Sequence, residues 1–228
     1  LLDRFAPMNA QRQDGKQPYW TNQIYTMKHS IVLSTQPAQF QAATFKGNLE
    51  TNLEQIASLG YDGVELAIRD PRLINLELLD GLINKYELRV PAIGTGQAWG
   101  EEGLSLTEPD LSIRKAAVER IKSHIPVAAH FGAIIIIGLL RGIVRPDVTQ
   151  IQAMDWLVAE LRECSSAAKP YGVRLALEPI NRYETTLINQ VAEGLALIQE
   201  VGADNFFLFG KTVEAAVSYT HLTLPTIY

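Results

Sequence analysis

The sequence predicts an α/β fold in which short parallel strands alternate with amphipathic helices. Two patterns carry this prediction. From Ser30 onward, apolar runs of strand length alternate with longer stretches that have helical periodicity. The strand-like runs are rich in Val, Ile and Leu, and they lack the alternating polar residues of a sheet that faces water on one side. Such runs are typical of parallel strands with both faces covered.

Six strands are expected. Their ranges are 31–34, 63–67, 88–93, 133–139, 172–178 and 206–209. Between them, apolar residues recur with helical spacing, most clearly in 49–56, 154–168 and 191–198, which predicts helices that pack on the sheet. Helix boundaries are indicated by two expected N-caps and four turn glycines, namely Asn75, Asp110, Gly60, Gly132, Gly172 and Gly202.

Composition limits the class of protein. The chain has 228 residues, of which 47% are hydrophobic and 20% are charged, as expected for one soluble globular domain. A net charge of −5 argues against nucleic acid as a partner, because such binding depends on clustered Lys and Arg. The longest apolar run, 133–140, is far shorter than the ~20 residues that a membrane helix needs. The single cysteine, Cys164, indicates a reducing, cytoplasmic compartment.

The two ends of the chain are expected to lie outside the folded domain. Residues 217–226 read V-S-Y-T-H-L-T-L-P-T, which resembles the translation of a transposase-type sequencing adapter, so 217–228 is excluded as an artefactual tail. Met27 directly precedes the first strand-like run, and 1–26 is therefore expected to be a disordered leader or upstream sequence. These boundaries predict a domain over 27–216 that is cut off on its C-terminal side. Any activity then belongs to the parent protein.

Residues at the strand ends decide between two α/β architectures that share this periodicity. An open doubly wound sheet binds its ligand near a glycine-rich turn after the first strand, but the turn at 34–37 contains no glycine. In a barrel, functional side chains collect at the C-terminal ends of many strands. Here they close or follow the second to fifth strands, as Glu65, the segment 94–97, Arg141 and Glu178. We therefore predict an incomplete (β/α)8 TIM barrel with about six of its eight units.

Glu178 is the strongest candidate for a catalytic or metal-binding residue. It ends the apolar run V-R-L-A-L-E and is followed by Pro179. Buried strand ends rarely carry an unpaired charge. The carboxylate is therefore expected to bind a metal ion, to transfer a proton, or to form an ion pair with Arg141 or Arg182.

The loop after this strand, 179–186, is dense in hydrogen-bonding side chains. Asn181, Arg182 and Glu184 lie within it and are candidates for substrate binding. Arg182 and Glu184 could instead form a solvated ion pair. A loop needs no such density merely to turn, so we expect this loop to line the site.

The segment 92–107 contains four glycines and supplies another candidate. Gly94 and Gly96 allow the backbone to approach a ligand closely. Gln97 could then offer a hydrogen bond to substrate, beside an exposed Trp99. The alternative is a long surface loop in which Trp99 packs on neighbouring helices.

Arg141 and Glu65 each allow two interpretations. Arg141 could hold a carboxylate or phosphate group of a ligand, or it could be an internal partner of Glu178. Glu65 could contact substrate, or it could pair with Arg69 as a structural clamp.

Four segments together resemble the xylose isomerase-like TIM-barrel sugar isomerases and epimerases. They are G-T-G-Q-A at 94–98, G-L-S-L-T at 103–107, F-G-A-I-I-I-I-G-L-L-R-G at 131–142 and L-E-P-I-N-R-Y-E-T-T-L-I-N at 177–189. The closest likeness is to the 5-keto-L-gluconate epimerase branch, with the ketose 3-epimerases further off. The resemblance covers about residues 27–205. Inosose dehydratases and endonuclease IV share the fold.

The resemblance implies one divalent metal ion, commonly Mn²⁺, Co²⁺ or Mg²⁺, held by side chains after strands five to eight. Glu178 matches the first of these ligands and one of the two carboxylates that act as acid and base. Glu184 matches a Glu that binds substrate. The implied reaction removes a proton next to a carbonyl and passes through an enediolate, which the metal stabilises.

The resemblance further implies a keto-sugar or keto-sugar acid as substrate, and a homo-oligomer. Where the family has Asp-Thr-Phe-His, residues 211–214 read Lys-Thr-Val-Glu, so the 228-residue chain by itself is expected neither to hold metal tightly nor to turn over. An inosose dehydratase-like lyase and an endonuclease IV-like nuclease are the alternatives. The net charge of −5 and the presence of only four His in the sequence disfavour the nuclease.

Overall fold

A single parallel sheet forms the centre of the protein. The computed structural model describes residues 28–37 and 45–210. Six strands occur in the order β1-β2-β3-β4-β5-β6, and each neighbouring pair is parallel. Their bounds are β1 Ser30–Ser34, β2 Gly63–Ala67, β3 Arg89–Gly94, β4 Ile134–Ile137, β5 Leu175–Leu177 and β6 Phe206–Leu208. The expectations for 1–26 and 211–228 concern residues outside the described part of the chain.

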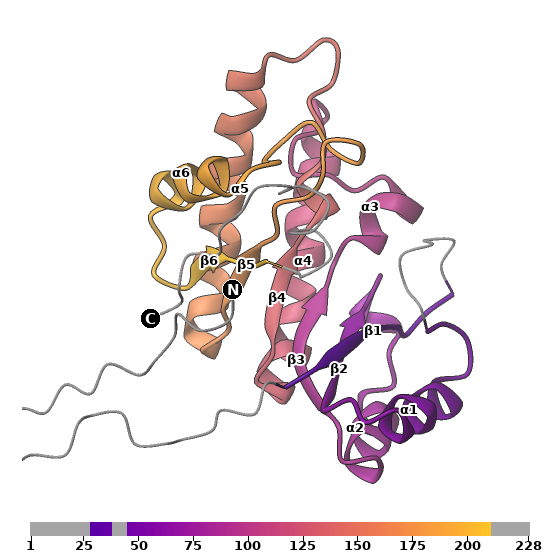
Figure 1. Ribbon diagram of the computed structural model, residues 1–228. Helices are drawn as coiled ribbons and strands as arrows, with labels where there is room; N and C mark the ends of the chain where they lie inside the picture. Colours follow the sequence, from indigo (N-terminus) through magenta and orange to yellow (C-terminus); the bar gives the residue numbers. More distant parts are fainter. Residues whose placement is uncertain (1–27, 38–44, 211–228) are drawn as a thin grey trace, which may run out of the picture.

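Helices connect the strands in sequence. The α-helices are α1 Leu49–Ser58, α2 Leu76–Lys85, α3 Gln97–Glu102, α4 Leu111–Phe131, α5 Gln150–Ala168 and α6 Val191–Val201. Short 3₁₀ helices are η1 Pro71–Leu73, η2 Leu139–Arg141 and η3 Lys169–Tyr171. Helices α1 and α2 lie together at one end of the sheet, and α5 and α6 lie together at the other (Figure 1). Within the described ranges, no helix has the length and apolar character needed to cross a membrane.

The predicted alternation of strands and helices is confirmed, and the last three strands are shorter than expected. The run 133–139 yields only β4, because Gly138 has φ −97° and ψ −119° and turns the chain into η2. The run 172–178 yields only β5, since Gly172 ends η3 in the left-handed conformation.

The expected helix ends are confirmed where the structure gives them. Asn75 accepts a hydrogen bond from the backbone of Leu78, and Asp110 accepts one from Ser112, as N-caps do. Gly132 and Gly202 terminate α4 and α6 with φ of +65°. Each of these ends turns the chain toward or away from the sheet.

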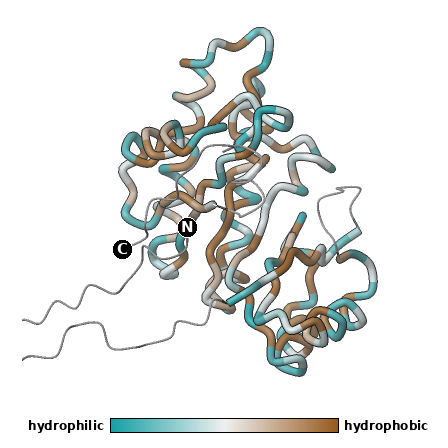
Figure 2. The backbone as a smooth tube through the Cα atoms, viewed as in Figure 1, coloured by the Kyte–Doolittle hydropathy of each residue, from teal (hydrophilic) through white to brown (hydrophobic). Residues whose placement is uncertain are grey.

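The two faces of the sheet have different compositions. One face, which we call the helix face, packs into the hydrophobic core with the helices; its central row is Leu33, Leu66, Ile93, Ile135, Leu175 and Phe206. The other face, which we call the inner face, carries the adjacent row Ser34, Ala67, Gly94, Ile136 and Ala176. Figure 2 shows the hydrophobic colour running along β4. Because side chains alternate along a strand, each strand contributes to both faces.

Candidate functional site

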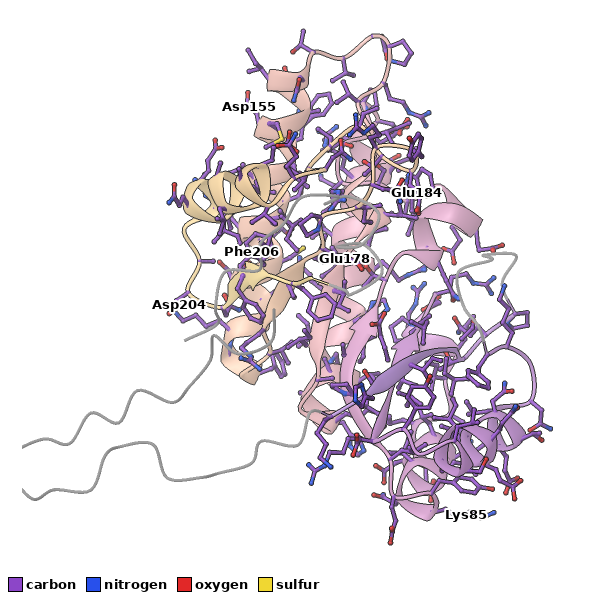
Figure 3. The ribbon with its side chains drawn as sticks, viewed as in Figure 1. Lys85, Asp155, Glu178, Glu184, Asp204 and Phe206 are labelled. Carbon is purple, nitrogen blue, oxygen red and sulfur yellow. The ribbon has the colours of Figure 1, made fainter. Side chains whose placement is uncertain are left out.

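Glu178 lies at the carboxyl end of β5, on the inner face. Its backbone N–H donates to the carbonyl oxygen of Ile137 (3.1 Å), which extends the pairing of β4 with β5 by one residue. The side chain is only 7% exposed. A Cβ atom at Gly138 would come within 3.1 Å of Glu178 Oε2, so the glycine leaves the space that the carboxylate occupies. In Figure 3 Glu178 is at the centre of the molecule.

Glu65 is a second buried carboxylate on the same face. It lies in β2, pairs in register with Ala92, and is 7% exposed. A Cβ atom at Gly94 would be 3.3 Å from Glu65 Oε1, so this carboxylate also lies over a glycine of the neighbouring strand. Arg69 Nε lies 3.4 Å from Glu102 Oε1, so this arginine has a carboxylate partner in α3, and the expected clamp between Glu65 and Arg69 stays a prediction.

Arg141 is fully buried at the end of η2. Its guanidinium donates to the backbone carbonyl oxygen of Glu178 and to that of Ile188 (3.5 Å). Of the two interpretations made from the sequence, this geometry favours the internal one. Arg141 holds the main chain of Glu178 against the far end of the following loop.

The loops after β3, β4 and β5 are tied together next to Arg141. Thr107 Oγ1 donates to the carbonyl oxygens of Arg141 (3.0 Å) and Ile143 (3.1 Å), and Thr185 Oγ1 donates to that of Gly142 (2.9 Å). Gly142 has φ +89°, and a Cβ atom there would lie 2.0 Å from Ser105 Oγ. The close approach of these loops therefore requires glycine at this position.

The loop after β5 presents Glu184 to solvent. Asn181 Nδ2 donates to Glu184 Oε1 (2.6 Å), and Asn181 Oδ1 accepts from the backbone of Tyr183 (2.9 Å). Arg182 is exposed, and among the described residues no ion pair joins it to Glu184. The orientation of Glu184 is thus set by Asn181 rather than by the solvated ion pair that was the alternative. Figure 3 places Glu184 beyond Glu178, away from the centre of the molecule.

The segment 92–107 is not one long loop. It contains α3, whose first turn is closed by hydrogen bonds such as Ala98 N–H to the carbonyl of Thr95 (3.2 Å). Trp99 is half-buried and packs against the hydrophobic core, so the expectation of an exposed Trp99 is wrong. Gln97 is 2% exposed and donates through Nε2 to Ser34 Oγ (2.7 Å).

A buried ionic network, which sequence reasoning missed, fixes α3 to its surroundings. Arg120 Nη2 contacts Glu102 Oε2 (2.7 Å) in α3 and lies 3.6 Å from Asp70 Oδ2 after β2. Asp70 also binds Arg72 (Nη2–Oδ2 2.6 Å). Asp70 and Arg72 are two residues apart, but Glu102 and Arg120 come from other elements, so no local pattern indicated that these four side chains meet.

The network gives a pH-dependent stability. Hydrogen bonds from Arg72, aided by the charge of Arg120, lower the pKa of Asp70 from 3.8 to about 2, so its stabilisation is complete above pH 4 and is lost as pH falls through 2. We expect Asp70→Asn to lower the free energy of unfolding at neutral pH by about 2 kcal/mol and to remove that part of the acid dependence. Urea unfolding at several pH values measures both.

Asp204→Asn provides the matched control for this prediction. Asp204 also pairs with a cation, Lys169 (2.8 Å), but its side chain is 71% exposed, so removing its charge should change stability little. Equal effects of the two substitutions would contradict the assignment to the buried network.

The described residues do not complete a metal site. Within 28–37 and 45–210, no group of three or more His, Cys, Asp or Glu side chains is placed to hold a metal ion. Glu178 is the single member of the expected ligand set that the structure describes. The residues 211–214, which depart from the expected pattern, lie outside the described part of the chain.

Comparison with known proteins agrees with this geometry. Residues 53–214 match the family model described as xylose isomerase-like TIM barrel. The chain belongs to this family. Its six parallel strands in an open sheet correspond to a partial (β/α)8 barrel, as predicted.

Several family members are named sugar epimerases. The chain is 31% identical over 183 residues to an L-ribulose 3-epimerase of Mesorhizobium japonicum, covering 79% of this chain and 58% of that protein. It is 29% identical over 194 residues to a D-psicose 3-epimerase of Ruminiclostridium cellulolyticum, covering 78% and 60%. A crystal structure of D-allulose 3-epimerase from Methylomonas sp. superposes with a TM-score of 0.65 at 26% identity, covering 75% of this chain and 59% of that one. The chain thus spans about three fifths of the length of these relatives.

Proposed function

We propose that the whole protein is an epimerase of a keto-sugar. The observation that carries this proposal is the buried Glu178 carboxylate, held over Gly138 at the carboxyl end of β5 on the inner face. The family relatives support it, since those named L-ribulose 3-epimerase and D-psicose 3-epimerase act on ketoses. A carboxylate in this place is suited to proton transfer at a carbon next to a carbonyl group.

Glu178 is proposed as the group that moves this proton. It removes the proton from the carbon beside the ketone, and the electron pair of the C–H bond passes into an enediolate. Return of a proton to the opposite face inverts the carbon and regenerates the ketone. The second carboxylate that this requires is expected outside the described residues. Arg141 donates to the carbonyl oxygen of Glu178, and the ring of Pro179 restricts the backbone of the next residue. Together they hold the main chain from which the carboxylate extends.

Dependence on one divalent metal ion, Mn²⁺, Co²⁺ or Mg²⁺, remains part of the proposal. When bound, such an ion would polarise the carbonyl group of the substrate. Among the described residues, Glu178 is the one proposed to coordinate it.

The substrate-binding residues are proposed from their placement. Glu184, oriented by Asn181, offers carboxylate oxygens to sugar hydroxyl groups at the end of the β5–α6 loop. Arg182 is exposed in the same loop. Glu65 offers a buried acceptor on the inner face. Arg141 is proposed to act on substrate indirectly, by positioning Glu178 and this loop.

The test is an assay of the protein expressed from the complete gene, read from the source DNA beyond the codon for Ala216. Incubation with D-allulose, L-ribulose and 5-keto-L-gluconate in D₂O should give the epimer of one of them, with deuterium at the inverted carbon. Epimerisation of 5-keto-L-gluconate would support the closer resemblance to the 5-keto-L-gluconate epimerases. Chelation should abolish activity and Mn²⁺ should restore it. Epimerisation of none of these compounds would contradict the proposal.

Two further expectations accompany this function. A cytoplasmic location and a homo-oligomeric assembly follow from the sequence argument and from the family resemblance. Cell fractionation and light scattering of the same protein test them. For the 228-residue chain alone, we propose no turnover.

A further inference from the structure

Gln97 reaches across the inner face at the carboxyl end of the sheet. It begins α3, after β3, yet its side-chain amide is bonded to Ser34 at the end of β1. Ser34, Ala67 and Gly94 form one row of this face, on β1, β2 and β3. Gly94 has no side chain, and the space above it is occupied by the carboxylate of Glu65, whose Oε1 lies close to Gly94. Gly94 on β3 is two strand spacings, or about 10 Å, from Ser34 on β1.

The hydroxyl of Ser34 fixes which way round the amide lies. Ser34 Oγ has a single proton, and it donates this proton to the carbonyl oxygen of Gln36 (2.7 Å). Toward Gln97 it can therefore only accept, so the group of Gln97 that faces Ser34 is the NH₂ (2.7 Å). The amide oxygen Oε1 consequently points to the other side.

The Ser34–Gln36 turn is itself rigid. Gln36 Oε1 accepts from the backbone N–H groups of Arg69 (3.0 Å) and Asp70 (2.8 Å), and Gln36 Nε2 donates to the carbonyl of Asp70 (2.7 Å). Rotation of the Gln97 amide by half a turn would place its oxygen against the Ser34 oxygen. The preceding hydrogen bonds prevent Ser34 from turning to accommodate it.

The Oε1 atom of Gln97 is buried and makes no hydrogen bond to any described residue. A buried carbonyl oxygen without a donor is destabilising by about 1–3 kcal/mol and is rare in native structures. The protein thus holds an oriented acceptor at the carboxyl end of the sheet that no donor among the described residues satisfies.

We infer that Gln97 Oε1 accepts a hydrogen bond from a hydroxyl group of the sugar, and that Ser34 is the positioning residue that orients it. This inference rests on the proposed function and deepens it. Gln97 Oε1 and Glu65 are both acceptors, so this part of the site selects a neutral hydroxyl donor and disfavours a carboxylate or phosphate group.

Kinetics of the complete gene product test the inference. Gln97→Met keeps the length of the side chain but has no amide, and it should lower kcat/KM for the ketose substrate about tenfold, mainly through KM, because one hydrogen bond is lost. Ser34→Ala should lower it several-fold. The double variant should be no worse than Gln97→Met, because Ser34 acts only through Gln97. Gln199→Met, on the exposed side of α6, is the matched control and should not change either constant.

Monodeoxy ketoses give a readout that no folding defect can imitate. The wild-type protein should lose about tenfold in kcat/KM with the ketose that lacks the recognised hydroxyl. Gln97→Met should not distinguish that compound from the parent sugar. If the wild-type protein epimerises ketoses but shows no such loss with any monodeoxy analogue, the inference is wrong and the proposed function stands. If it epimerises no ketose, both are overturned.

Discussion

Glu178→Gln should lower kcat/KM of the complete protein by about 10²–10⁴-fold, which is the usual contribution of a positioned proton-transfer group. The amide has nearly the same shape as the carboxylate, so the space over Gly138 remains filled. The backbone contacts of Glu178 with Ile137 and Arg141 involve no side-chain atom of Glu178 and should persist. Epimerisation and deuterium incorporation from D₂O should fall together.

Two controls separate chemistry from folding in this experiment. Glu200→Gln makes the same chemical change on an exposed residue of α6 and should leave kcat/KM unchanged. Glu184→Gln removes a proposed substrate contact and should mainly raise KM. If Glu178→Gln kept deuterium incorporation at the wild-type rate, Glu178 would not be the group that moves the proton.

Gly142→Ala should be the most damaging single substitution for stability at the mouth of the site. At φ +89° an alanine is strained, and its Cβ would lie 2.0 Å from Ser105 Oγ and 2.4 Å from Thr107 Oγ1. The Thr107 hydroxyl bonds to the loop after β4 and the Ser105 hydroxyl accepts from the backbone of Thr107, so displacing either one breaks a hydrogen bond. We expect the free energy of unfolding to fall by about 3 kcal/mol or more, measured by urea denaturation.

Gly103→Ala distinguishes the two causes of this effect. Gly103 also has positive φ, +69°, but a Cβ atom there would meet nothing within 4 Å. Its cost should be limited to the backbone, about 1 kcal/mol. Equal losses for the two variants would show that the crowding around Gly142 has no energetic consequence.

The strands and the principal candidate for the site, Glu178, were accessible from the sequence for local reasons. Apolar runs such as that around Ile135 mark buried parallel strands, and a charge that directly follows one, as Glu178 does, is conspicuous. The N-caps at Asn75 and Asp110 are likewise local signals. Periodicity alone could not distinguish the barrel from an open sheet; the collection of candidate functional residues at the ends of several strands favoured the barrel, and the family resemblance agreed with it.

The contacts between loops were not accessible in the same way. Arg69 pairs with Glu102 in α3, a partner that no local pattern indicated. Arg141 donates to the carbonyl oxygens of Glu178 and Ile188, which belong to the two ends of the loop after β5. Helix α3 was concealed by the glycines around it. Each of these features depends on contacts between loops that are distant in the sequence. Such contacts produce no periodic pattern from which a single sequence could predict them.

The alternation of side chains along the strands places residues that pack in the core and residues of the inner face at alternate positions. Leu66 and Ile93 point toward the helices and determine whether the chain folds, whereas their immediate neighbours Glu65, Ala67 and Gly94 point to the inner face. Under the proposed function, substitutions on the inner face would act on recognition of the sugar, and substitutions at the alternate positions would act on folding. The two properties can then evolve at different residues of the same strand.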